Sequence, residues 1–135
     1  MNKKFLLIVA LFLICLFASA QNISYQAVAK SLRNMQTQNY DKAVATDIKI
    51  VRKGNSSVSV GNTSYSVVTV DKDMTSNSVT TKQYTVNDSN GNEYVIIFTD
   101  DPTAAINLMK HYVVIFNTSH PYDWTYYFCS EPKDE

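Results

Sequence analysis

The residues best suited to chemistry are few and lie near the end of the chain. His111 and His120 are the only histidines, and Asp123 and Cys129 follow them. A cysteine nucleophile needs a base within hydrogen-bond reach and a partly exposed thiolate, but Cys129 ends an apolar run. A metal site built from His111, His120 and Asp123 would lack the ligand spacing typical of zinc sites. The sequence therefore predicts no enzyme, no metal and no cofactor.

An acidic pair, Asp100 and Asp101, precedes Pro102. This order favours a helix cap over a general acid, because a carboxylate accepts from the first helical N–H groups and proline suits the first position. We therefore expect a short helical insertion over residues 102–109. The three glycines are spread singly along the chain and form no phosphate-binding loop.

Aromatic side chains are the strongest remaining signal. They alternate with their neighbours along several apolar segments, so they either fill a core or line an apolar pocket in which tyrosine hydroxyls orient a ligand. The two interpretations are compatible. The candidate ligand-binding residues are Tyr84, Tyr94, Phe98, Tyr112, Phe116 and Tyr126.

These aromatic residues sit in segments with the period of two that is typical of strands. The expected strands cover residues 44–50, 58–60, 65–70, 79–86, 94–99, 112–117 and 124–129. Gly61-Asn62 and the polar run 87–92 predict tight hairpins, and residues 71–77 form a polar break. With residues 23–30 as a further strand there are eight, enough to close into a barrel that holds a core or one small ligand.

Residues 21–38 are ambiguous. Val28, Leu32 and Met35 recur at a helical spacing, whereas residues 23–30 also fit a strand. The sequence leaves both interpretations open.

The first 20 residues predict a signal peptide. Lys3 and Lys4 precede an apolar run over residues 5–17, and Ala18-Ser19-Ala20 forms a small-residue cleavage site. This run is shorter than the ~20 residues of a membrane-spanning helix. We expect a single domain over residues 21–135, secreted to the exterior, or to the periplasm in a bacterium.

The charges and cysteines of the domain limit its partners. Twelve basic and twelve acidic residues balance, with no basic stripe for nucleic acid or a membrane surface. Cys15 would leave with the signal peptide, so Cys129 would be either a buried thiol, which we favour, or the link in a disulfide dimer. Five Asn-x-Ser/Thr acceptors for glycosylation occur, at Asn22, Asn55, Asn62, Asn87 and Asn117.

The order of these segments resembles the lipocalins, in particular the apolipoprotein D and bacterial lipocalin branch. Residues 23–30 (Ile-Ser-Tyr-Gln-Ala-Val-Ala-Lys) are similar to its first strand, Gly-x-Trp-Tyr-Glu-Val-Ala-Arg. Residues 94–100 and 112–116 resemble the strands entering and leaving its Thr-Asp-Tyr turn, and residues 123–132 its closing strand. Ile23, Tyr25 and Ser130 stand where that branch has Gly, Trp and Arg, and the resemblance stops at Pro132, short of the family's C-terminal helix.

Pattern and resemblance together predict an all-β fold, an eight-stranded antiparallel up-and-down barrel with a short helical insertion before the last two strands. The resemblance implies a secreted carrier of a small hydrophobic, lipid-like ligand. The alternative is a protein-binding module such as a cystatin-like protease inhibitor, which the helical spacing of Val28, Leu32 and Met35 before antiparallel strands would suit. Helix content separates the two.

Overall fold

The computed structural model describes residues 22–135, so the predicted signal peptide 1–20 and Cys15 lie outside the described residues. Strands form nearly all of the regular structure. The elements are β1 (Asn22–Asn34), β2 (Asn39–Tyr40), β3 (Val44–Lys53), β4 (Ser57–Val60), β5 (Thr63–Ser76), β6 (Val79–Asn87), β7 (Glu93–Asp100), the 3-10 helix η1 (Asn107–Met109), β8 (His111–Asn117), β9 (Asp123–Cys129) and β10 (Lys133–Asp134). Within residues 22–135 no helix is long and apolar enough to cross a membrane.

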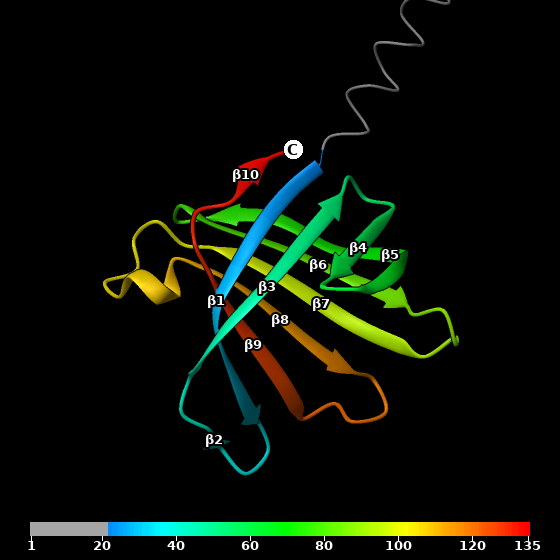
Figure 1. Ribbon diagram of the computed structural model, residues 1–135, viewed down its shortest axis with the longest axis horizontal. Coiled ribbons are helices and arrows are strands. Elements are labelled where there is room, and N and C mark those ends of the chain that lie inside the picture. Colours follow the sequence, from blue (N-terminus) through cyan, green and yellow to red (C-terminus); the bar gives the residue numbers. More distant parts are fainter. Residues whose placement is uncertain (1–21) are drawn as a thin grey trace, which may run out of the picture.

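Eight of these strands close into one antiparallel barrel (Figure 1). The order around the barrel is β1-β3-β4-β5-β6-β7-β8-β9, and β9 pairs back onto β1. Successive strands are neighbours throughout, apart from the two-residue β2 and β10, which pair with the ends of β1. The predicted all-β, up-and-down barrel is confirmed, and it is consistent with a lipocalin-like fold.

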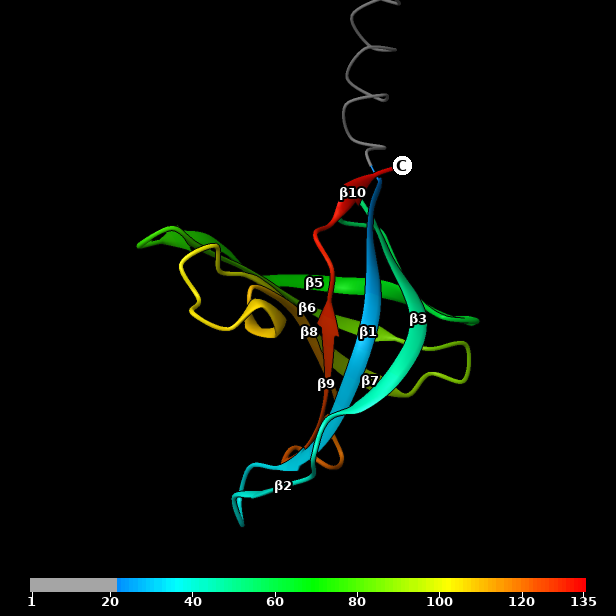
Figure 2. The ribbon, with the colours of Figure 1, turned by 60° about the vertical axis from the view of Figure 1, so that its left-hand side comes forward.

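Strand β1 closes the barrel because it pairs on both sides. Its first part pairs with β3 and its second part with β9, and Figure 2 shows β1 running between these two strands. A β-bulge between Ala27 and Ala29 shifts the register of both pairings. The strand prediction for residues 23–30 is therefore confirmed, and the helical interpretation of Val28, Leu32 and Met35 is wrong. Positions four apart share a face in a strand as well as in a helix, so the spacing of Val28 and Leu32 could not separate the two.

The expected short helical insertion over residues 102–109 is present only as the single 3-10 turn η1. Asp101 does not cap a helix; its carboxylate accepts the backbone N–H and the hydroxyl of Thr103 in a local turn. Ile106 is extended at φ −100°, and η1 contains no buried residue, so no apolar face holds a longer helix in place. The Asp101 N–H donates to the Lys110 carbonyl at 2.7 Å and closes the loop at its base.

The hairpins behave largely as the turn residues predict. Gly61, at φ +58°, joins β4 to β5 in a backbone region that side chains rarely adopt. The Asp88 carboxylate accepts the N–H groups of Asn90 and Asn92 and so orders the turn before β7. The polar break expected at residues 71–77 is instead the far part of β5, which is exposed on both faces and therefore lacks alternation.

Large side chains fill one half of the barrel interior. The Phe98 ring centroid lies 5.2 Å from that of Tyr25 and 5.9 Å from that of Tyr84, and all three residues are almost fully buried. The guanidinium of Arg52, a residue only 6% exposed, lies 5.2 Å from the centre of the Phe98 ring. We call Tyr25, Tyr84 and Phe98 the plug. Ile50, Val58, Val86, Ile96 and Val113 complete this buried core.

Candidate functional site

The other half of the barrel interior contains a cup-shaped cavity of about 450 Å³. Its apolar lining comes from inward-facing positions of six strands: Ile48, Val60, Tyr65, Tyr94, Ile115 and Tyr127. All six pack against or belong to the core cluster. Polar side chains at the ends of strands and in turns also line it: Asn62, Thr63, Asn117, Asp123 and Thr125. We call this cavity the cup.

Three of the lining residues are tyrosines: Tyr65, Tyr94 and Tyr127. The rings of Tyr65 and Tyr94 meet edge to face, with centroids 5.2 Å apart. Burial raises the pKa of Tyr65 and of Tyr127, and nearby Tyr94, Tyr127 and Asp88 raise that of Tyr65 further. Across residues 22–135 none of the three hydroxyls has a hydrogen-bond partner in the protein. They remain available to a ligand.

The six residues predicted to bind a ligand divide among three places. Tyr94 lines the cup, and Phe116 borders it while its ring stacks on Trp124 outside the barrel. Tyr84 and Phe98 belong to the plug, where they fill space. Tyr112 and Tyr126 lie on the outside of the barrel. Each is next in sequence to a residue that faces inward, Val113 in β8 and Tyr127 in β9, and successive side chains of a strand point to opposite faces. The structure thus brings two of the six to the cup, and their ligand-binding role stays a prediction.

The outward aromatic residues form a stacked row, which we call the outer ladder: Tyr112, Phe116, Trp124, Tyr126 and Phe128. Phe116 and Trp124 stack at 5.0 Å with ring planes 4° apart, and the rings of Trp124, Tyr126 and Phe128 follow one another at 6.1–6.2 Å. The Arg33 guanidinium lies 4.3 Å from the centre of the Tyr126 ring, and η1 contacts β8 and β9. Arg33 and the loop before β8 therefore help cover apolar side chains outside the barrel.

The residues that line the cup and were missed in the sequence include Tyr65, Ile115 and Tyr127. In β9 both faces are apolar, since the ladder occupies one and the interior the other. Alternation therefore gave no reason to choose Tyr127 over Tyr126. Thr125 and Cys129, small side chains on the same face as Tyr127, are the one signal in β9 that marks its inward face.

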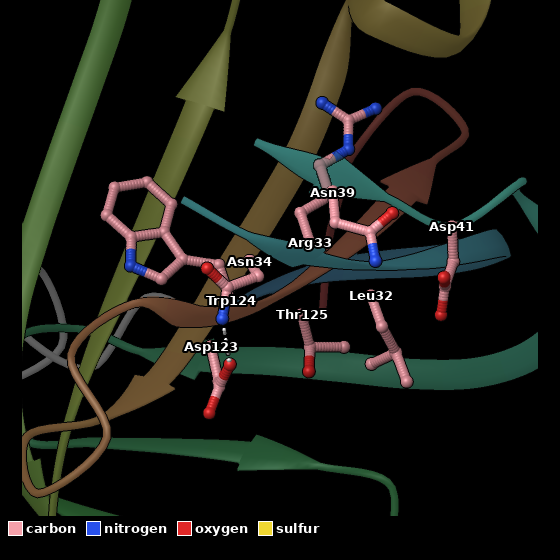
Figure 3. Close-up of a pocket in the computed structure, with 8 residues that line it drawn as sticks. All are labelled: Leu32, Arg33, Asn34, Asn39, Asp41, Asp123, Trp124 and Thr125. Atoms are coloured by element: carbon pink, nitrogen blue, oxygen red, sulfur yellow. Dashed lines mark hydrogen bonds between the residues drawn. The ribbon is translucent and has the colours of Figure 1, made fainter. Parts of the chain in front are cut away.

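A smaller cavity of about 270 Å³ lies between the end of β1, β2 and the start of β9 (Figure 3). Polar and charged residues contribute to its lining together with Leu32 and Trp124: Arg33, Asn34, Asn39, Asp41, Asp123 and Thr125. The Asn34 amide donates to the Asp123 carboxylate at 3.0 Å, so these two side chains partly satisfy one another.

The chemically reactive side chains lie at the plug end of the barrel. The Tyr25 hydroxyl donates to one Asp100 oxygen at 3.4 Å, and His111 Nδ1 lies 2.8 Å from the other. Cys129 is buried, and burial, with a smaller effect of Asp100, raises the pKa of its thiol to about 12. A thiol held protonated is a poor nucleophile. Over residues 22–135 no three His, Cys, Asp or Glu side chains are grouped so as to hold a metal ion.

The rate at which Cys129 reacts with a thiol reagent should show that its side chain is buried. We expect Cys129 in the native full-length protein to react with a thiol reagent far more slowly than in urea, because it is 4% exposed and protonated near neutral pH. Peptide mass spectrometry after labelling distinguishes Cys129 from Cys15. Rapid native labelling, or a dimer that disappears on reduction, would instead support the disulfide dimer through Cys129.

Alkaline pH should unfold the barrel as its tyrosines ionise. Burial is the largest cause of a raised pKa at Tyr25, Tyr65, Tyr126 and Tyr127. A tyrosine whose pKa is higher in the folded state stabilises the fold below its unfolded pKa of ~10 and loses that contribution as pH rises through the folded value. We expect part of the tyrosinate absorbance to appear only as near-ultraviolet circular dichroism is lost. Ionisation of all nine tyrosines near pH ~10 with the fold intact would contradict this placement.

The predicted glycosylation acceptors differ in their surroundings. Asn62 and Asn117 lie at the cup. Asn55 is exposed in the turn after β3, where its side-chain oxygen accepts the Tyr84 hydroxyl at 3.0 Å. Asn22 begins β1 and Asn87 ends β6. Glycosylation at these sites stays a prediction.

Comparison with known proteins adds no family to this picture: no protein-family model, no curated protein and no solved structure matches the chain. The resemblance to lipocalins rests on the barrel and on the sequence segments described above.

Proposed function

We propose that this protein is a small secreted lipocalin-like barrel that binds or carries a small hydrophobic ligand in the cup. The observation that carries the proposal is the cavity of about 450 Å³ with an aliphatic floor and three tyrosine hydroxyls that lack protein partners. Ligand pockets commonly measure ~300–1,000 Å³ and combine apolar walls with a few polar groups. The cup lies toward the smaller end of this range, which favours a compact ligand over a long acyl chain.

Binding would draw on the apolar surface that the cup leaves uncovered. Ile48, Val60 and Tyr65 are each partly exposed although they face the interior. A ligand that removes this surface from water gains about 25 cal/mol per Å² of apolar area. The cavity is already open in the structure without a ligand, which reduces the cost of ordering the site on binding.

Secretion rests on the signal-like segment of residues 1–20. The destination is the cell exterior, or the periplasm in a bacterium. The alternative of a cystatin-like inhibitor depended on a helix near the N-terminus, and residues 22–34 form a strand in the barrel wall. The helix on which that alternative depended is therefore absent from residues 22–34.

A fluorescence titration tests the proposal. N-phenyl-1-naphthylamine, a neutral apolar probe, should show saturable binding to the full-length protein. Val60→Trp should abolish this binding because the larger ring fills the cup from β4. Val68→Trp, on an exposed position of β5, is the matched control and should leave binding unchanged.

Circular dichroism checks that both variants keep the strand content of the wild type. Absence of saturable binding to the folded wild type would refute the carrier function. Unchanged binding by folded Val60→Trp would place the site elsewhere.

A further inference from the structure

The side chains that line the cup carry a single charge, which is negative. Asp123, at the start of β9, is the one charged side chain among the residues that line the cup. One of its carboxylate oxygens accepts the Asn34 amide, and the second has no hydrogen-bond partner within residues 22–135. No lysine, arginine or histidine lines this cavity. The second carboxylate oxygen is thus free to face a ligand.

Asp88, in the turn between β6 and β7, contributes to the raised pKa of Tyr65 after burial and after Tyr94 and Tyr127, but it does not line the cup. The basic side chains of the adjoining strands do not line the cup either. Lys30 is the register partner of Tyr127 but does not line the cup, and Lys49 forms an ion pair with Glu135.

This charge discriminates between ligands by the sign of their polar group. A carboxylate in the cup would lose hydration without meeting a cation, and it would be repelled by Asp123. An ammonium group would meet the free oxygen of Asp123, and the tyrosine ring faces and hydroxyl oxygens would also attract it.

We propose that the cup selects a small apolar amine, an aromatic or alkyl group bearing one ammonium, and rejects the corresponding carboxylic acid. This inference rests on the proposed function, since it names the ligand class of the same cavity. The Asp123 carboxylate fixes the ammonium at the rim while the apolar group occupies the space between Val60, Ile115 and Tyr127.

Three probes that share one ring system test the selectivity: 2-(2-naphthyl)ethylammonium, 2-(2-naphthyl)ethanol and 2-naphthylacetate. Isothermal titration of the full-length protein at neutral pH should show the amine binding at least about tenfold more tightly than the acid, with the alcohol between them. Asp123→Asn should weaken amine binding by about three- to tenfold and leave the alcohol unchanged. Asp73→Asn removes an exposed carboxylate from β5, outside the cup lining, and should change none of the three affinities.

The outcomes separate this inference from the proposed function. Equal affinities for the three probes, or tighter binding of the acid, would overturn the preference for an amine while leaving the cup as a binding site. An amine preference that persists unchanged in Asp123→Asn would overturn the role given to Asp123. Failure of all three probes to bind folded protein would refute the cup itself.

Discussion

Phe98→Ala is expected to lower the free energy of unfolding by about 3–5 kcal/mol. Phe98 is 1% exposed and lies at the centre of the plug, where its ring contacts Tyr25 and Tyr84. Its removal leaves a cavity among rigid neighbours and takes away the aromatic face beneath the buried Arg52 guanidinium. Two costs therefore add: lost packing, and poorer compensation of a buried charge.

Urea denaturation of the wild type and the variant measures this loss. Phe116→Ala is the matched control because the same side chain there belongs to the outer ladder, is partly exposed and stacks on Trp124. We expect the control to lose only about 1 kcal/mol. A Phe98 variant that loses no more than the Phe116 variant would contradict the assignment of Phe98 to a filled core.

Two adjacent substitutions in β1 should have opposite outcomes. Ala27 is 0% exposed and lies between its register partners Ile48 on β3 and Cys129 on β9. Ala27→Asp would place a carboxylate inside the barrel at the seam, and we expect a loss of more than about 3 kcal/mol or failure to fold. Val28 is 44% exposed, so Val28→Asp should change the stability by about 0.5 kcal/mol or less.

This pair of variants also tests the local structure. If residues 22–34 were a helix packed through Val28 and Leu32, Val28→Asp would be the damaging change and Ala27→Asp the tolerated one. Thermal unfolding followed by circular dichroism, together with the soluble yield of each variant, distinguishes the two orders of stability.

The sequence predicts the barrel where one face of a strand is polar. In β3, for instance, Ile48 faces inward and Lys49 outward, and turn residues such as Gly61 mark the ends. The sequence does not show which side chains face inward where apolar groups cover both faces of a strand. In β9 the outer ladder and the interior are both apolar, so the pattern gives no inward face, and the candidate site residues were assigned across both.

Two other features also depend on tertiary context. The bulge between Ala27 and Ala29 inserts one extra residue into β1 relative to β9, so the alternation of inward and outward side chains before the bulge does not continue in step after it. Whether Pro102 begins a helix depends on an apolar surface for it to pack against, and the exposed Leu108 shows that the barrel provides none for that side chain. The sequence could predict the cup only as a general property of eight-stranded barrels. The volume of the cup depends on how much of the interior the plug side chains fill, and the sequence does not show this.

The division of the interior into a plug and a cup has a consequence for how such a protein can change over generations. The side chains whose substitution costs most stability, such as Tyr25, Tyr84 and Phe98, are buried in the plug and do not line the cup. Val60, Tyr65 and Tyr94 line the cup and are less deeply buried, so substitutions there should cost less stability. Descendants of this chain can thus alter the shape and polarity of the cup and keep the same barrel.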